Sequence, residues 1–304
     1  YFGLETNKTI VTNSKDKKEF DYPKSENNDS DNYINIYDGN AGLILNKTDR
    51  IILAISKGDI NLAFSNNITN DSKILTNRNI IERAKKIMPY LTYDASPYLV
   101  VTDDGNLVWV IDAYTTSKYY PYSQKSNING QEINYIKNSV KVLVDAYDGT
   151  VKFYITDRTD PVIMAYNKAF PNVFMDLDSE IPQEISTHFT YSEFLYNIQA
   201  EILKRYHNTE SDVIYRANDV WDIAKYGTGT NSETQQTTQM TPYYAIIKTT
   251  DNDETTLGLV LPYTVQGKQS ITGYIVGTYE NGKMVMKLYR YPLDNAVLGP
   301  MQLD

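Results

Sequence analysis

Trp109-Val110-Ile111-Asp112-Ala113-Tyr114 and Val142-Leu143-Val144-Asp145-Ala146-Tyr147 are the two stretches that decide the fold of this 304-residue chain. Each is a run of β-branched and aromatic residues that ends in Asp-Ala-Tyr, a composition typical of strands. Asp103-Asp104-Gly105-Asn106 precedes the first stretch, and Asp148-Gly149-Thr150 follows the second. Because Asp-Gly between apolar runs favours tight hairpins, the sequence predicts a central antiparallel platform.

The elements around this platform define the expected fold class. Strands are predicted at 97–103, 107–115, 135–146 and 150–156, and again at 243–249, 257–262, 271–279 and 283–290. Helices are predicted over about 48–57, 78–88, 161–170 and 191–206, and Asp160 is expected to cap the third of them, with Pro161 in its first turn. Since helices and antiparallel strands are segregated rather than strictly alternating, we expect an α+β fold. We expect an N-terminal α+β domain over 1–175 with the central sheet. A helical segment and a β-rich region follow over 176–304, and the two parts can pack as one domain.

The first predicted helix has a clear start and an apolar face. Thr48 and Asp49 are expected to cap it. Ile51, Ile52 and Ile55 follow a helical spacing, so we expect them to face inward.

The last predicted helix, over 191–206, carries the strongest helical pattern. Thr190 and Glu193 are expected to form a capping box at its start. His207 follows the basic residues at its end and is expected to interact with the negative end of the helix dipole. The next segment, 227–239, is rich in Gly, Thr, Ser and Gln without periodicity, so we expect a mobile loop or linker.

Composition excludes several classes of protein. The net charge of −9 argues against a general nucleic-acid-binding surface, which needs a positive field. The absence of cysteine excludes disulfides and thiolate ligands. No uncharged apolar run approaches the roughly 18 residues needed to span a bilayer. The chain opens on Tyr1 and shows no signal segment, so we expect a piece of a longer protein.

Two aspartates, Asp112 and Asp145, could act as an acid/base pair, because glycosidases place two carboxylates about 5–9.5 Å apart. If 107–115 and 135–146 pair as antiparallel neighbours, the two residues lie about 17 Å apart along the ladder. A parallel or non-adjacent arrangement would restore the pair. The other interpretation is that both are turn-flanking residues that bind nearby backbone amides.

Metal sites and catalytic triads have little support in the sequence. His188 and His207 are the only histidines, so a site with several histidine ligands is excluded. The acidic stretch with Glu26, Asp29 and Asp31 could bind calcium, but it lacks the spacing of an EF-hand loop, and a surface loop is favoured. We therefore predict no cofactor.

The favoured binding candidate is a segment of tyrosines and lysines between two predicted strands. Tyrosine offers a flat apolar face and a hydroxyl group, which suits peptide and glycan surfaces. A loop between two strands would present such rings from a rigid base. The alternative is that the rings fill the core. The residues are Tyr114, Lys118, Tyr119, Tyr120 and Tyr122, with Lys125 beside them.

The whole chain resembles the extracytoplasmic region of the large multi-pass bacterial membrane proteins called Uncharacterised Protein Family 0182. The resemblance rests on short motifs spread over nearly the full length. They are Tyr1-Phe2-Gly3, Glu19-Phe20-Asp21-Tyr22-Pro23, Asp71-Ser72-Lys73-Ile74-Leu75, Arg78-Asn79-Ile80, Pro97-Tyr98-Leu99-Val100-Val101, Ile111-Asp112-Ala113-Tyr114-Thr115-Thr116-Ser117, Tyr120-Pro121-Tyr122-Ser123, Asn134-Tyr135-Ile136, Asn138-Ser139-Val140-Lys141-Val142 and Leu298-Gly299-Pro300.

The resemblance implies membrane helices before Tyr1, more sequence after Asp304, and a region held outside the cytoplasmic membrane, with its own membrane portion as a partner. It supplies no catalytic residues. A shorter stretch, Val144-Asp145-Ala146-Tyr147-Asp148-Gly149-Thr150-Val151, is similar to the hairpin of PepSY domains, small extracytoplasmic modules tied to peptidase regulation.

The leading hypothesis is a non-enzymatic extracytoplasmic domain of a cell-membrane protein that binds, senses or scaffolds at the envelope. Its partner would be an envelope protein, peptide or glycan. The alternative is a carboxylate-dependent hydrolase that acts on envelope glycans or peptides. A third hypothesis is a purely structural part of a transporter-like membrane protein.

Overall fold

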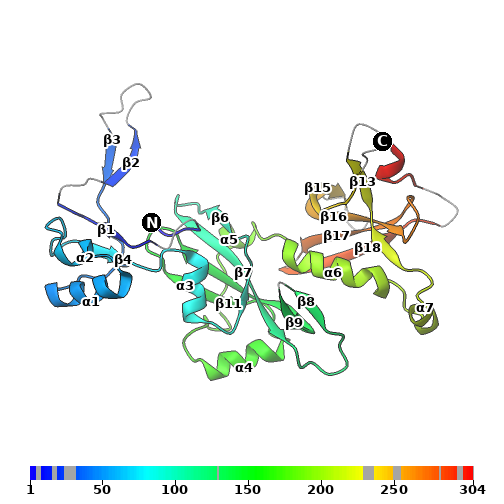
Figure 1. Ribbon diagram of the computed structural model, residues 1–304, viewed down its shortest axis with the longest axis horizontal. Coiled ribbons are helices and arrows are strands. Elements are labelled where there is room, and N and C mark those ends of the chain that lie inside the picture. The colour runs from blue at the N-terminus through cyan, green and yellow to red at the C-terminus, as the bar shows by residue number, and fades with distance from the viewer. Residues whose placement is uncertain are drawn as a thin grey trace. The chain divides into compact units, whose positions relative to one another are not determined.

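The computed structural model describes residues 1–4, 8–15, 19–23, 32–128, 130–228, 236–248, 255–280, 282–292 and 297–303 (Figure 1). The chain divides into two compact units, Tyr1–Ile185 and Ser186–Asp304. The sequence predicted this boundary between residues 175 and 176. Several antiparallel sheets together with helices confirm the predicted α+β fold class.

The first unit contains eleven of the described strands and five short or medium helices. The strands are β1 (Ile10–Thr12), β2 (Glu19–Pro23), β3 (Asn32–Asn35), β4 (Lys73–Leu75), β5 (Thr92–Tyr93), β6 (Tyr98–Val101), β7 (Leu107–Ser117), β8 (Ser126–Ile128), β9 (Gln131–Ile133), β10 (Tyr135–Asp145) and β11 (Val151–Ile155). The helices are α1 (Lys47–Lys57), α2 (Asn61–Phe64), α3 (Ile80–Ile87), α4 (Pro161–Ala169) and α5 (Gln183–Ser186) at the end of the unit.

The predicted platform is the five-stranded central sheet. Its order is β11-β10-β7-β5, and β6 also pairs with β7. The long strands β7 and β10 run antiparallel, with Ile111 opposite Val142. The β6–β7 hairpin pairs Val101 with Leu107, and the β10–β11 hairpin pairs Val144 with Val151. Both hairpins therefore form where Asp-Gly predicted them.

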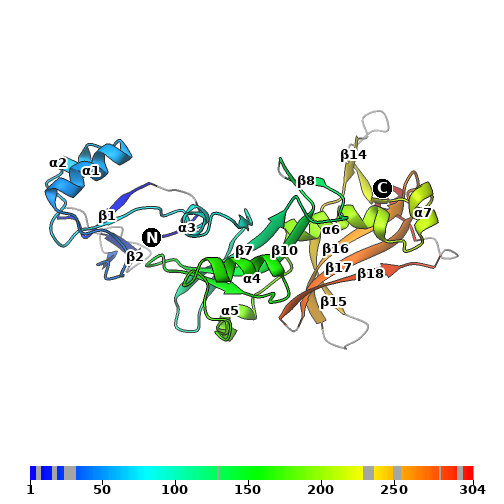
Figure 2. The ribbon, with the colours of Figure 1, turned by 90° about the horizontal axis from the view of Figure 1, so that it is seen from below.

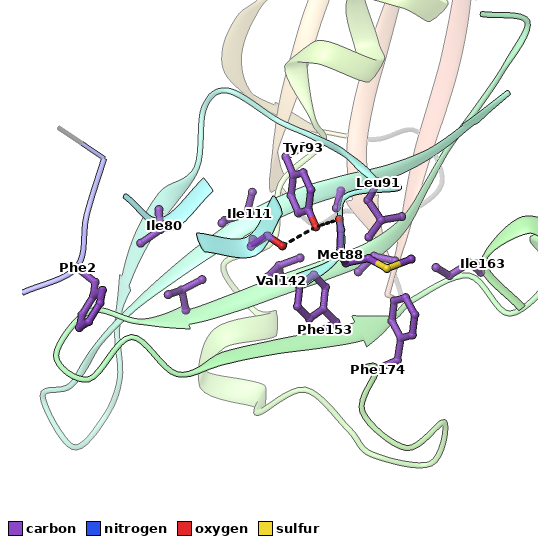
Figure 3. Packing of buried hydrophobic residues seen from close by; sticks show 14 of the residues in the cluster. Phe2, Ile80, Met88, Leu91, Tyr93, Ile111, Val142, Phe153, Ile163 and Phe174 are labelled. Atoms are coloured by element: carbon purple, nitrogen blue, oxygen red, sulfur yellow. Dashed lines mark hydrogen bonds between the residues drawn. The ribbon is translucent and has the colours of Figure 1, made fainter. Parts of the chain in front are cut away.

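One face of this sheet and two helices enclose the main core (Figure 3). Strand residues Ile111, Val142 and Phe153 meet Met88, just after α3, and Ile163 of α4. Burying each such side chain stabilises the fold by about 1.5–3 kcal/mol. The Tyr93 hydroxyl also lies in this core, where its single proton is shared between the Met88 carbonyl at 2.7 Å and the Ala84 carbonyl at 3.1 Å. These bonds satisfy a polar group that would otherwise be costly to bury.

The α1 helix forms, but the Asn46 side chain caps it by accepting from the Asp49 amide, so the cap predicted from Thr48 and Asp49 is wrong. The orientation of the helix also differs from the prediction. Ile51, Ile52 and Ile55 are 43%, 62% and 78% exposed, so the prediction that they face inward is wrong. Arg50 and Ala54 face inward instead. The reason is that the Arg50 guanidinium satisfies the carbonyl of Leu62 at 2.9 Å and two further carbonyls in the chain that follows α2. Backbone acceptors therefore determine which side of α1 is buried.

The second unit is a sheet covered by one helix. Its elements are α6 (Glu193–Tyr206), α7 (Ser211–Arg216), β12 (Trp221–Ile223), β13 (Lys225–Thr228), β14 (Gln236–Gln239), β15 (Tyr243–Lys248), β16 (Thr255–Val265), β17 (Ile271–Glu280), β18 (Lys283–Arg290) and α8 (Pro300–Leu303). The sheet order is β12-β16-β17-β18, with β15 also paired to β16.

Helix α6 lies along this sheet (Figures 1 and 2). Tyr196 and Ala200 of α6 pack against Leu261 of β16 and Ile275 of β17. Two tyrosine hydroxyls fasten the layers: Tyr196 donates to the Ile275 carbonyl at 2.9 Å, and Tyr263 donates to the Ala200 carbonyl at 2.8 Å. Aromatic rings with a polar tip thus supply both apolar contact and hydrogen bonds between helix and sheet.

Two local predictions in this unit need correction. Ser192 caps α6 by accepting from the Leu195 amide at 3.2 Å, so the capping box predicted from Thr190 and Glu193 is wrong. Within 227–239, β13 pairs with β14 along 225–228 and 236–239, so this segment contains strands rather than only loop. Residues 229–235 lie outside the described residues. Across the described parts of both units, no helix has the length and apolarity needed to cross a bilayer.

Candidate binding surface

The candidate surface lies where the chain leaves the central sheet between β7 and β10. We call residues 118–125 the aromatic loop. After this loop the chain forms a small hairpin of β8 and β9 (Figure 1), then enters β10 at Tyr135. Ser126 pairs with Ile133 in the hairpin, and an ion pair joins Lys125 to Glu132 at 2.7 Å. The hairpin thus fixes one end of the aromatic loop.

The three tyrosines of the aromatic loop are exposed. Tyr119, Tyr120 and Tyr122 are 81%, 49% and 109% accessible. The Lys118 ammonium lies 5.2 Å from the centre of the Tyr119 ring, a distance at which a cation is attracted by the ring face. The alternative, that these rings fill the core, is therefore wrong for Tyr119 and Tyr122, and Tyr120 is half exposed.

Asn134 holds the aromatic loop in shape. Its side-chain oxygen accepts from the Tyr120 amide at 3.0 Å, while its amide group donates to the Tyr120 carbonyl at 2.7 Å and to the Ser123 carbonyl at 3.2 Å. The Ser123 hydroxyl donates back to the Asn134 carbonyl at 2.8 Å. One asparagine thus satisfies several backbone groups that a loop would otherwise leave to water, and it presents the rings from a defined backbone.

A stack of rings connects the aromatic loop to the interior. Tyr120 stacks on Tyr135 of β10 with ring centres 5.0 Å apart and an angle of 19° between the planes. The Tyr135 hydroxyl donates to the Asp160 carboxylate at 2.7 Å. The same carboxylate accepts from Ser139 at 2.6 Å and from Thr115 at 2.5 Å. The position of Tyr120 is therefore tied to the start of α4.

Asp160 is fully buried and anchors this network. It caps α4 through the Val162 amide at 2.9 Å, as predicted. Burial alone would raise the pKa of the carboxyl group, but the hydrogen bonds from Ser139, Thr115, Tyr135 and the Val162 amide outweigh it and hold the pKa below its ordinary value. The charged form is thus the stable one, and Asp160 has a structural role here.

Tyr122 has an unusual backbone conformation. Its φ is +60°, in the left-handed region that non-glycine residues seldom adopt. A side chain in this region costs about 1–2 kcal/mol relative to the ordinary helical region. Backbone strain of this kind concentrates at functional sites. The strain, together with the complete exposure of the ring, makes Tyr122 the most informative residue of the loop.

Two of the predicted site residues are buried and lie apart from this surface. Tyr114 is fully buried, and its hydroxyl donates to the Asp94 carboxylate at 2.7 Å. Asp112 is also buried, forms an ion pair with the Lys141 ammonium, and accepts from the Asn138 amide group at 2.8 Å. A bound ligand would not reach either residue. The accessible part of the predicted site is therefore Lys118, Tyr119, Tyr120 and Tyr122, together with the partly exposed Asp145 at the end of β10.

The predicted carboxylate pair is separated by the register of the sheet. Asp112 lies opposite Lys141, and Asp145 lies opposite Val108. The step from Lys141 to Asp145 corresponds to about 13 Å at roughly 3.3 Å per residue. This exceeds the separation that glycosidases use. Asp145 instead accepts from the amides of Tyr147 and Asp148 at 2.7 and 2.9 Å, which is the turn role that the sequence predicted. The same prediction is wrong for Asp112, which lies within β7 and binds side chains.

The two histidines occupy separate structural settings. His188 is exposed in a turn. His207 follows α6 as predicted, with Nδ1 2.9 Å from the Leu203 carbonyl and Nε2 3.3 Å from the Asp219 carboxylate. Its ring stacks on Trp221. Over the described residues, no group of three or more His, Asp or Glu side chains is placed to hold a metal ion. The calcium candidates Glu26, Asp29 and Asp31 lie outside the described residues.

Sequence reasoning missed the residues that support the surface. Asn134, Tyr135 and Asp160 position the aromatic loop, yet each is an ordinary polar residue in the sequence. Asp160 was predicted only as a helix cap. Asn134 immediately before a strand is the one available signal, because asparagine favours turns and binds nearby backbone.

The comparisons with known proteins identify the family. A family model described as Uncharacterised protein family (UPF0182) matches residues 1–304. The chain belongs to this family. A UPF0182 protein from Caldicellulosiruptor saccharolyticus is 38% identical over 100% of this chain and 32% of its own length. UPF0182 proteins from Desulfitobacterium hafniense and Methanospirillum hungatei are each 40% identical over 100% of this chain, and over 31% and 33% of their own lengths.

This UPF0182 chain thus spans about a third of the length of the curated relatives that it matches. No solved structure matches it. The family description assigns no reaction, so the surface described above is the basis for a functional proposal.

Proposed function

We propose that this chain is a non-enzymatic, extracytoplasmic region of a cell-membrane protein, and that it binds an envelope glycan through the aromatic loop. The observation that carries the proposal is the exposure of Tyr119 and Tyr122 on a loop fixed by Asn134. A preformed surface binds at a smaller entropic cost than a mobile one. Flat rings suit the apolar faces of sugars, and the surrounding amide and hydroxyl groups suit their hydroxyls.

The membrane part of the proposal has separate support. The short motifs of this chain resemble those of an extracytoplasmic region, and the curated relatives are about three times as long as the chain. The remaining length leaves ample room for membrane segments, each of which needs about 20 apolar residues. Protease added to intact cells should therefore cleave this region. Protection in intact cells and cleavage only after lysis would contradict the extracytoplasmic placement.

A carboxylate-dependent hydrolase is the weaker proposal. The Asp112 carboxylate forms an ion pair with Lys141, and the Asp145 carboxylate accepts a hydrogen bond within its own turn. Among the described residues, no interaction joins either carboxylate to the aromatic loop. We therefore expect no hydrolysis of a glycan that the loop binds.

The test of glycan binding uses envelopes purified from the organism that makes the protein. One portion is treated with protease and another with periodate, which cleaves the vicinal diols of sugars. We expect the protein to sediment with the protease-treated portion and to lose binding after periodate. The double variant Tyr119→Ala/Tyr122→Ala should bind at least tenfold less. Tyr215→Ala is the matched control, because Tyr215 is 87% exposed and lies far along the chain in α7.

Three results would overturn the proposal. Binding that survives periodate but not protease would identify a protein or peptide partner. Binding that is equal in the double variant and in Tyr215→Ala would exclude the aromatic loop. No binding to any portion would exclude an envelope ligand.

A further inference from the structure

Helices α1 and α2 carry an apolar surface that their own core does not use. On α1 it consists of Ile51, Ile52 and Ile55, which lie on the side away from the buried Arg50 and Ala54. Ile60, which immediately precedes the neighbouring α2, and Phe64 at the end of α2 are also exposed, at 74% and 73%. We call these five side chains the α1–α2 surface.

The α1–α2 surface is held on a firm scaffold. The Asn46 side chain caps the start of α1 by accepting from the Asp49 amide at 2.9 Å. Gly58, with φ of +67°, ends the helix and donates to its last carbonyls. Arg50 fastens α1 to the Leu62 carbonyl of α2 at 2.9 Å. Since both ends and the inner side are fixed, the exposed isoleucines belong to a formed helix and not to a fraying end.

The exposed apolar residues of α1 are confined to one side of the helix. Ile51 and Ile55 are four positions apart, and Ile52 adjoins them, so the three share one side of the helix. Asp49 and Ser56, which are exposed, lie on the polar flank of this side. The small core beneath α1 uses Ala54, Leu62 and Ile74. A helix whose larger apolar side faces outward indicates a partner for that side.

We propose that the α1–α2 surface packs, in the full-length protein, against the part of the polypeptide that lies outside residues 1–304. The relatives match this chain over only 31–33% of their own lengths. Roughly two thirds of a full-length polypeptide is therefore available to cover it. The proposal is independent of glycan binding, which uses a different surface.

Size favours a tethered partner over a separate one. Five side chains, on helices of 11 and 4 residues and on the residue before the second helix, make a small surface. Stable interfaces between separate proteins bury about 800 Å² on each partner. Segments of one polypeptide meet at a high effective concentration, so a smaller surface is sufficient. No charged side chain is among the five, so the covering segment should present apolar residues to them.

Photo-crosslinking in the full-length protein tests this inference. The variants Ile52→benzoylphenylalanine and Ile55→benzoylphenylalanine place a crosslinker on the α1–α2 surface. The control Ser56→benzoylphenylalanine places it on the polar flank. We expect the first two to crosslink within the same polypeptide to a peptide outside residues 1–304, and the control to do so at least fivefold less, as read by mass spectrometry.

A labelling experiment gives an independent result from the same protein. A maleimide should react with Ile55→Cys at least tenfold more slowly than with Ser56→Cys in the full-length protein, because only the first is covered. Equal rates would overturn the inference. A crosslink to residues 186–304, to lipid or to a second copy would also overturn it, as would the absence of any crosslink. Loss of glycan binding alone would leave these results unchanged, so the two proposals fail separately.

Discussion

Tyr120 of the aromatic loop stacks on Tyr135 of β10, with ring centres 5.0 Å apart, and this contact joins the exposed surface to the buried Asp160. The loop is thereby part of the sheet architecture and not an independent segment. Desolvation and the hydrogen bond to Asp160 raise the pKa of the Tyr135 hydroxyl above its ordinary value, so this group stays protonated and remains a donor.

The stack and the hydrogen bond of Tyr135 should have separable effects. Tyr135→Phe keeps the ring but loses the bond to Asp160, so we expect a loss of about 1 kcal/mol in unfolding free energy and unchanged envelope binding. Tyr135→Ala also removes the platform for Tyr120 and should weaken binding severalfold. Urea unfolding and cosedimentation measure the two quantities. Equal binding by both variants would show that the stack does not position the loop.

Tyr122 should favour envelope binding and lower the free energy of unfolding. Tyr122→Gly relieves the left-handed backbone at φ +60°, so we expect unfolding free energy to rise by up to about 1 kcal/mol. The same change removes a fully exposed ring and should lower envelope binding. The control is Tyr119→Gly, which should lower binding without a gain in stability. If Tyr122→Gly were destabilising, the strain would not be present.

The buried pair of Asp112 and Lys141 should be a stability element without a role in binding. Lys141→Met leaves a buried carboxylate without its cation, and we expect a loss of about 3–5 kcal/mol. The double variant Asp112→Leu/Lys141→Met removes both charges and should recover most of this loss. Chemical denaturation of the three proteins measures the coupling. An equal loss in the single and double variants would contradict the assignment.

Asp160 should make the free energy of unfolding fall at acidic pH. Its pKa is lower in the folded chain than in the unfolded chain, where it is about 3.9. Its stabilisation is therefore fully present above about pH 4 and is lost as the pH falls through the folded-state pKa. Asp160→Asn should cost about 2–3 kcal/mol at pH 7.

That deficit should shrink when the pH is lowered from 4 towards 2. Urea midpoints of the wild type and of Asp160→Asn at pH 7, 4 and 2 measure it. A difference between wild type and Asp160→Asn that stays constant down to pH 2 would contradict the charged, hydrogen-bonded state of Asp160.

Local patterns in the sequence predicted the strands of the two five-stranded sheets except the short β5 and β12, but they predicted neither the smaller two-stranded sheets nor the contacts between distant parts. Alternating β-branched residues and Asp-Gly turns specified β6, β7, β10 and β11, because strand propensity and turn geometry are local. The side of α1 that is buried was not predictable, because it depends on carbonyls near Leu62 and Ser65 that accept from Arg50.

The candidate surface could also be predicted only in part, because it depends on contacts between distant residues. Tyr119, Tyr120 and Tyr122 were found from composition and from their place between strands. Their exposure, and the burial of Tyr114 a few residues earlier, depend on where the strand ends and on what covers it. The contacts of Asn134 and Asp160 join residues that no sequence spacing marks as neighbours.

Hydroxyl-radical footprinting shows whether the aromatic loop binds the glycan, because it reports which side chains a ligand covers. The protein is oxidised with and without protease-treated envelope glycan, and oxidation of each tyrosine is read by mass spectrometry. We expect Tyr119 and Tyr122 to be protected at least threefold and Tyr215 to be unchanged. Unchanged oxidation of Tyr119 and Tyr122 while the protein is bound would show that the ligand does not cover the aromatic loop.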